Sequence, residues 1–127
     1  MKKLFVYVAG AYTKPDPVVN TAKAIQFGNF LLDHGYIPFV PHLSMYQHML
    51  QARPWQEWLD IDFEWIRKCD ALIRLPGESA GADAEIKHAI EIGVPVLNIQ
   101  DSDENMRHRV LNYLEDIAEA KEPRAAQ

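Results

Sequence analysis

Short apolar runs alternate with amphipathic segments along this sequence, and that alternation limits the possible folds more than any other feature. Four runs have the composition and length of strands that are buried on both faces, and they lie at 4–9, 36–40, 70–75 and 94–99. Segments with helical spacing follow them, near 18–34, 54–68, 81–92 and 106–120. Strands that alternate with helices favour right-handed crossovers and a parallel sheet.

We therefore expect a three-layer α/β domain, flavodoxin- or Rossmann-like, with four or five parallel strands and helices on both faces. The apolar stripe expected for the first helix is Val18, Ala22, Ile25 and Leu32, and that for the last helix is Met106, Val110, Leu114 and Ile117. The segment 42–53 has no clear period and is expected to be a long loop, with room for a short helix. Residues 1–120 are expected to form a single domain, and 121–127 a frayed tail.

Composition excludes several classes of partner and site. Of 127 residues, 18 are acidic and 13 are Lys or Arg, which gives a net charge of -5 and argues against polymeric nucleic acid. No stretch approaches the ~20 apolar residues of a membrane span. Cys69 is the single cysteine, so no intrachain disulfide can form, and a reducing cytoplasm fits. The five histidines and Cys69 lack the spacing of a metal site, and no phosphate-binding glycine motif is present.

Two carboxylates fall on helix faces that the pattern turns toward the sheet. At about 100° per residue, Glu85 lies with Ala82 and Ala89, opposite the polar side of its helix. Asp62 follows Trp58 by four positions and shares an apolar face with it. Burial there would raise the pKa of Asp62, as a general acid requires. A loop cap or a buried ion pair would explain either carboxylate alone, whereas two in one small domain favour a functional site.

Further candidates lie where strands end, at the edge of a parallel sheet that binds ligands. Tyr7 lies near the end of the first strand and is either core or functional, and Gly10 then permits a sharp turn. Ser79 and Gly81 lie at the start of the third helix, where free N–H groups attract phosphate or carboxylate, although Ser79 serves equally well as an N-cap. His42 directly follows the second strand and either contacts a substrate or stabilises a loop.

These segments also resemble a known family when taken in order. The matching stretches are Tyr7-Val8-Ala9-Gly10, Asp62-Phe63-Glu64-Trp65-Ile66 before Cys69-Asp70-Ala71, Ser79-Ala80-Gly81 with Glu85 and Ala89, and Gly93-Val94-Pro95-Val96. Together they resemble the nucleoside 2-deoxyribosyltransferase superfamily, and most of all its branch of 2′-deoxynucleoside 5′-phosphate N-hydrolases. The resemblance extends over residues 4–96.

The resemblance implies chemistry at the N-glycosidic bond of a small nucleoside or nucleotide, without metal or organic cofactor. Glu85 would be the nucleophile or the stabiliser of the oxocarbenium ion at the sugar C1′, and Asp62 the acid that protonates the departing base. Tyr7 would hold Glu85, Ser79 would contact a 5′-phosphate, and His42 would lie beside the substrate. Relatives complete their sites with a neighbouring subunit, which implies a homodimer or a larger homo-oligomer.

The chain also departs from the pattern of that family. Ala11 stands where the hydrolases tend to have a hydroxyl residue near the phosphate, and Asp83 would repel a phosphate if it faced inward. The segment Leu43–Trp58 has no clear counterpart. Three functions are therefore considered: hydrolysis of a (deoxy)nucleoside 5′-monophosphate, transfer of the sugar to another base, and nucleotide binding without catalysis. A Glu85 engaged in a structural ion pair would indicate the last of these.

Overall fold

The computed structural model describes residues 3–101 and 103–121. Its centre is a parallel sheet in the order β2-β1-β3-β4, formed by β1 (Phe5–Ala9), β2 (Ile37–Phe39), β3 (Ala71–Arg74) and β4 (Val96–Asn98). In the middle of the sheet, Tyr7 of β1 lies opposite Phe39 on one side and Leu72 on the other. The expected α/β fold with parallel strands is confirmed. The chain runs from β1 to β2 on one side of β1, and later to β3 on the other side of β1. The strand order therefore reverses between β1 and β3.

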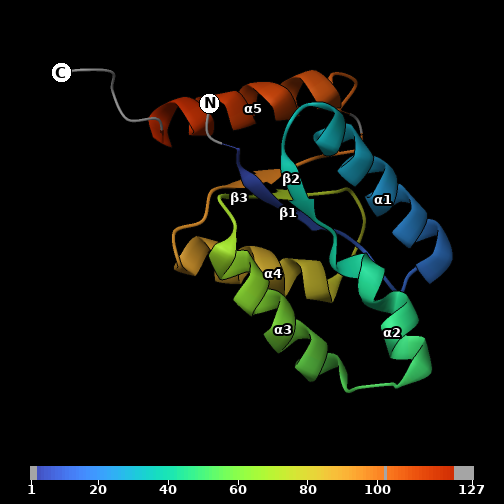
Figure 1. Ribbon diagram of the computed structural model, residues 1–127. Coiled ribbons are helices and arrows are strands. Elements are labelled where there is room, and N and C mark those ends of the chain that lie inside the picture. The colour runs from blue at the N-terminus through green and yellow to red at the C-terminus, as the bar shows by residue number, and fades with distance from the viewer. Residues whose placement is uncertain (1–2, 102, 122–127) are drawn as a thin grey trace.

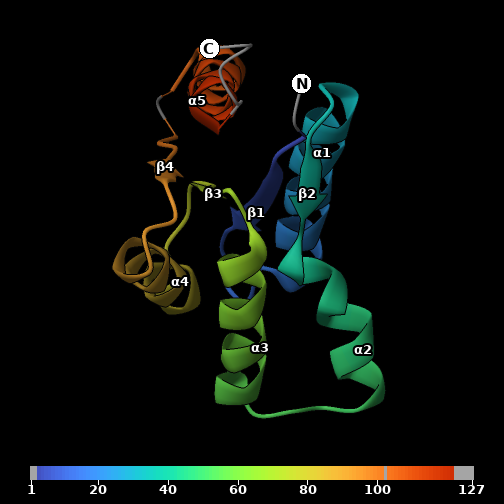
Figure 2. The same ribbon diagram turned by 60° about the vertical axis from the view of Figure 1, so that its left-hand side comes forward.

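Helices cover both faces of this sheet (Figure 1, Figure 2). One face packs against α1 (Pro17–Asp33) and α5 (Met106–Lys121), and the other against α3 (Trp55–Lys68) and α4 (Ala80–Glu91). Alternate strand residues point to opposite faces, so each face has its own core. The core under α1 and α5 contains Val6, Val8, Ile73, Phe27, Leu31, Val110 and Leu114. The smaller core under α3 and α4 contains Tyr7, Ala9, Leu72, Ile66, Ala82 and Ala89.

The ends of α1 and α4 follow from local side-chain chemistry. Asp16 caps α1, because its Oδ1 accepts hydrogen bonds from the N–H groups of Val18 at 2.8 Å and Val19 at 3.2 Å. After the C-terminal ends of α1 and α4, Gly35 and Gly93 adopt φ values of 86° and 82°, which side-chain-bearing residues rarely adopt. Each helix therefore stops in time for the chain to enter the next strand.

The apolar stripe expected for the first helix was wrong. Val18 and Leu32 are 65% and 57% exposed, and the face in the core is instead Ala24, Phe27, Phe30 and Leu31. Helix α1 has two apolar stripes on nearly opposite sides, and the stripe with two phenylalanines buries more surface. In α5 the expected Val110 and Leu114 are buried, and Met106 and Ile117 pack against them.

The segment without a clear period is mostly helical. It forms a 3₁₀ turn, η1 (Pro41–Ser44), followed by the short helix α2 (Met45–Leu50), and a loop then leads to α3. In Figure 2, α2 and the start of α3 extend beyond the carboxyl ends of the strands. This segment therefore forms a wall beside the carboxyl edge of the sheet.

The C-terminal region departs slightly from expectation. Helix α5 includes Lys121, whose Nζ lies 2.8 Å from Oδ1 of Asp70, and residues 122–127 of the expected frayed tail lie outside the described residues. Within the described part of the chain, no helix has both the length and the apolar character needed to cross a membrane.

Candidate active site

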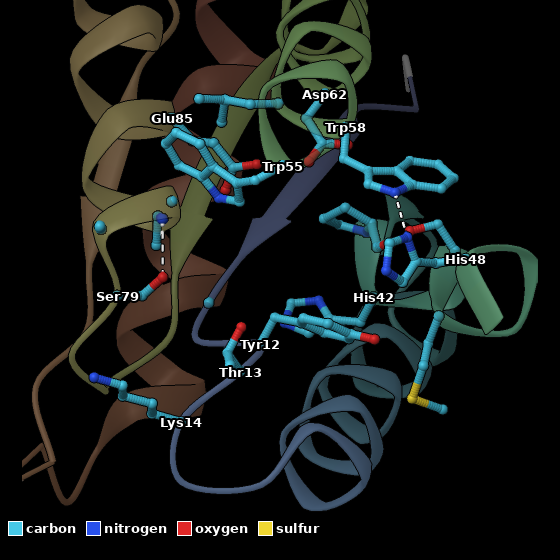
Figure 3. Close-up of a pocket in the computed structure, with 18 of the residues that line it drawn as sticks. Tyr12, Thr13, Lys14, His42, His48, Trp55, Trp58, Asp62, Ser79 and Glu85 are labelled. Atoms are coloured by element: carbon cyan, nitrogen blue, oxygen red, sulfur yellow. Dashed lines mark hydrogen bonds between the residues drawn. The ribbon is translucent and has the colours of Figure 1, made fainter. Parts of the chain in front are cut away.

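A cavity of about 680 Å³ opens at the carboxyl ends of the strands. Its walls come from the turn after β1, the η1–α2 segment, the first turns of α3 and the start of α4. Asp62 and Glu85 lie together on one side, Ser79 and Lys14 on a second, and His48 across the cavity from Ser79, where Trp58 of α3 reaches it (Figure 3). The cavity lies beside the β1–β3 reversal, and its volume is within the usual range for sites of small organic ligands.

Tyr7 and Glu85 form a buried hydrogen bond beside this cavity. Tyr7 is fully buried, and its hydroxyl donates to Oε2 of Glu85 at 2.5 Å. Glu85 is 5% exposed and lies between the buried Ala82 and Ala89 on α4, as the helical projection predicted. The projection succeeds because small residues on either side of Glu85 let α4 pack closely against the sheet. The contact inferred between Tyr7 and Glu85 is therefore present.

Asp62 comes from α3 and lines the same cavity as Glu85, so the two carboxyl groups face one cleft as predicted. Burial raises the pKa of Asp62 to about 6, against the hydrogen bonds of Glu85 and Tyr7, which lower it. Burial also raises the pKa of Glu85 well above its ordinary value; the Tyr7 hydroxyl opposes this rise, and the neighbouring Asp62 adds to it. The pair therefore retains a proton at a pH where isolated carboxyls have lost theirs.

Tyr7 itself remains a donor under these conditions. Burial, followed by the negative charge of Glu85, raises the pKa of the Tyr7 hydroxyl well above its ordinary value. A neutral phenol, a carboxylate and a carboxylic acid can thus coexist at the base of the cavity. Such a set offers one negative charge and one transferable proton within reach of the same ligand.

His42 and Gly10 lie side by side at the turn after β1. His42 is buried, and its Nε2 lies 3.0 Å from the carbonyl oxygen of Ala11, to which it donates. Burial lowers the pKa of His42, so the ring is neutral at physiological pH. A Cβ at Gly10 would lie 3.7 Å from this ring, an ordinary van der Waals distance, so the ring packs directly over the turn. His42 lines the cavity; its Nε2–H stabilises the turn, whereas its buried Nδ1 has no hydrogen-bond partner among the described residues, so both interpretations of this residue stay predictions.

Ser79 and Gly81 form the cavity wall at the start of α4. The Oγ of Ser79 accepts from the N–H of Ala82 at 3.0 Å, so Ser79 is the N-cap of α4. Its hydroxyl hydrogen is still available to a ligand. A Cβ at Gly81 would lie 3.6 Å from Nε1 of Trp55, whose ring lies beside this helix end (Figure 3).

Asp83 does not face the cavity. It pairs with Arg74, which is 7% exposed and also donates to the carbonyl oxygen of Gly77 at 2.7 Å. These groups line a separate hollow on the outer side of the β3–α4 loop. The positive charge of Arg74 also lowers the pKa of Glu85, in opposition to its burial.

Sequence reasoning did not single out several residues of this region, among them Lys14, His48, Trp58 as a cavity residue, and Arg74. The residues considered after the first strand ended one position before Lys14. Arg74 was visible as a charged residue at the end of the otherwise apolar segment 71–74. His48 and Trp58 gave no signal as a pair, because they lie ten positions apart on different helices. Their contact depends on the path of the loop between those helices.

Comparison with curated proteins finds no match for this chain. A family model does match residues 4–99, from the residue before β1 to the residue after β4, and its description is "Domain of unknown function (DUF7768)". The matched region includes the whole sheet and every residue that lines the cavity, and it leaves α5 outside. The chain therefore belongs to the DUF7768 family of domains, whose function is unknown.

Proposed function

We propose that this chain hydrolyses the N-glycosidic bond of nucleoside or deoxynucleoside 5′-monophosphates. The observation that carries the proposal is the buried hydrogen bond from Tyr7 to Glu85 beside Asp62, in a cavity of about 680 Å³. Carboxyl groups with different surroundings are what this reaction needs, because one must be charged while the other carries a proton. The resemblance to nucleoside 2-deoxyribosyltransferases and N-hydrolases supports the same reaction.

In the proposed reaction, the bond between C1′ and the base nitrogen breaks as positive charge builds at C1′. Ionised Glu85 bonds to C1′ or stabilises its charge, and Asp62 gives its proton to the departing base. Water then adds to C1′ and loses a proton to Asp62, which releases the sugar phosphate and restores Glu85. Free base and sugar 5′-phosphate are the products.

The shared proton must lie on Asp62 when the bond breaks. Burial favours protonation of Glu85, whereas the hydroxyl of Tyr7 and the charge of Arg74 favour its ionised form. A sugar that develops positive charge beside Glu85 also stabilises the ionised form of this carboxyl group. The bound substrate therefore shifts the negative charge to Glu85 and the proton to Asp62.

A 5′-phosphate fits the side of the cavity formed by the start of α4. The N–H groups there, the hydroxyl of Ser79 and the ammonium group of Lys14 are all suited to an anion (Figure 3). Asp83 is turned away and paired with Arg74, so it does not oppose a phosphate. These features favour nucleotides over nucleosides as substrates.

Two other functions compete with hydrolysis. A deoxyribosyltransferase would share the first step and pass the sugar to a second base instead of to water. A nucleotide-binding domain without catalysis would use Glu85 structurally. Among the described residues no ion pair involves Glu85, and its neighbour Arg74 pairs with Asp83, which disfavours that alternative.

We also propose that the chain assembles into a homodimer or larger homo-oligomer in the cytoplasm. Apolar side chains that are at least 63% exposed cluster on the η1–α2 segment next to the cavity: Leu43, Tyr46, Met49 and Leu50. A second subunit would cover them and complete the cavity wall. Light scattering of the wild type and of Met49→Glu tests this, because the charge should shift the mass to that of a monomer.

The reaction is tested with a panel of nucleosides and their 5′-monophosphates, each incubated with the protein and analysed for free base. Release of base from monophosphates in the absence of any second base supports hydrolysis. Release only when a second base is added, together with formation of a new nucleoside, would identify a transferase. No release under either condition would contradict both enzymatic functions.

A further inference from the structure

His48 is held in a single protonation pattern by its neighbours in the wall formed by α2 and α3. Its Nδ1 accepts from Nε1 of Trp58 at 2.7 Å and from the backbone N–H of Arg53 at 3.2 Å. Both partners are obligatory donors, so Nδ1 must be the acceptor nitrogen of the ring. The proton of the neutral imidazole therefore lies on Nε2.

The Nε2–H of His48 is available to a ligand. His48 lines the cavity, and its Nε2 has no hydrogen-bond partner in the part of the chain that the structure describes. It is also not among the buried polar atoms that lack a partner, so water can reach it. Figure 3 shows the ring of His48 across the cavity from Ser79. The ring therefore presents one fixed donor on the side away from the proposed phosphate site.

Aromatic rings surround the space between this donor and the two carboxyl groups. Trp55 and Trp58 of α3 and Tyr12 of the turn after β1 all line the cavity (Figure 3). Flat aromatic side chains stack on a planar ring and stabilise its binding, and this stacking is similar for all bases. The edge of such a ring, by contrast, is distinguished by hydrogen bonds.

We infer that the Nε2–H of His48 donates to an acceptor on the edge of the substrate's base, and that the site prefers bases with a carbonyl oxygen or ring nitrogen there. This inference rests on the proposed function and adds the class of base to it. An exocyclic amino group at the same place would point its N–H at the Nε2–H of His48, and no hydrogen bond could form between these two donors. His48 cannot adapt by moving its proton to Nδ1, because Trp58 and Arg53 already direct hydrogens at that atom.

The test compares bases that differ in one edge group. Binding of 5′-monophosphates is measured by calorimetry with the Glu85→Gln variant, so that turnover does not consume the ligand. The pairs are hypoxanthine with adenine and uracil with cytosine, in which a carbonyl replaces an amino group, and guanine with 7-deazaguanine, which lacks one ring acceptor. For at least one pair we expect a preference of about three- to tenfold for the acceptor.

Two variants then assign that preference to His48. His48→Phe keeps a ring in the wall and should bring the preference close to onefold. Trp58→Phe keeps an aromatic surface and removes the shorter of the two hydrogen bonds that hold Nδ1 of His48, so it should reduce the preference, while the N–H of Arg53 still donates to that atom. His108→Phe is the matched control, because His108 is exposed on α5, away from the cavity, and the change should leave the preference as it was. Circular dichroism checks that each variant is folded. If His48→Phe does not fold, Trp58→Phe still tests the inference.

An acceptor preference that is equal with and without His48, or one that is absent in every pair, would overturn the inference while nucleotide binding itself stands. A folded Glu85→Gln protein that binds no nucleotide would contradict the proposed function, and the inference would fall with it.

Discussion

The shared proton of Asp62 and Glu85 predicts a stability that falls as the pH rises. Burial raises the pKa of Asp62 from 3.8 to about 6, so the folded state holds this proton more tightly than the unfolded chain does. The stabilisation from this proton is fully present below pH ~4 and is lost as the pH rises through about 6. The pKa of Glu85 is also raised, so the loss of stability continues to higher pH.

The magnitude of this loss follows from the pKa of Asp62 in the folded state. At pH 5 the folded carboxyl is one unit below its pKa of about 6, and one pKa unit corresponds to about 1.4 kcal/mol. Between pH 5 and pH 8 the wild type should therefore lose about 1.4 kcal/mol through Asp62, less what solvent screens around this partly buried group. Asp62→Asn removes that titration, so its free energy of unfolding should depend less on pH by about that amount.

Urea unfolding at several pH values between 5 and 8 measures this difference. Asp60→Asn is the matched control, because Asp60 lies on the same helix and is exposed, where it accepts a hydrogen bond from Gln56. Asp60→Asn should follow the wild-type pH dependence. If Asp62→Asn also follows it within about 0.3 kcal/mol, or becomes steeper, the inference of a buried shared proton is wrong.

Three further predictions concern neighbouring groups. Tyr7→Phe should lower kcat about 10- to 100-fold, because a hydrogen bond to a charged group contributes about 1.5–3 kcal/mol, and it should shift the pH profile of kcat to higher pH. An unchanged pH profile would show that Tyr7 does not act on the ionisation of Glu85. Ser79→Ala should reduce the preference for 5′-monophosphates over nucleosides, measured as a ratio of kcat/KM values, whereas equal losses on both substrates would indicate a capping role alone. Arg74→Met should destabilise the fold by about 1–2 kcal/mol in urea unfolding, because the carbonyl of Gly77 loses its partner, and a variant as stable as the wild type would show that this contact does not hold the loop.

The sequence predicted the fold and the residues that meet at the centre of the cavity for a clear physical reason. Strand runs and helical spacing act locally, and Glu85 was an anomaly within its own helix because the residues around it are small and apolar. Tyr7 was placed correctly because a buried residue near the end of a strand must point toward one of the two helical layers. Only the resemblance paired it with Glu85.

Features that depend on contacts between distant segments could not be predicted in this way. The two apolar stripes of α1 are equally regular in the sequence, and the packing of Phe27 and Phe30 against the sheet decides between them. The hydrogen bond from Trp58 to His48 depends on the turn after α2, where no periodic pattern exists. The pairing of Arg74 with Asp83 similarly depends on how the loop between β3 and α4 folds back.

The central claim is that the carboxylate of Glu85 acts on the sugar, and one measurement tests it most directly. Release of free base from a 5′-monophosphate is followed for the wild type, for Glu85→Gln and for Glu91→Gln, a matched change at an exposed position of the same helix. We predict that Glu91→Gln keeps wild-type activity and that Glu85→Gln loses at least about a thousandfold while it remains folded, since a lost nucleophile removes a large part of the catalysis. Activity of Glu85→Gln within about tenfold of the wild type would contradict the claim.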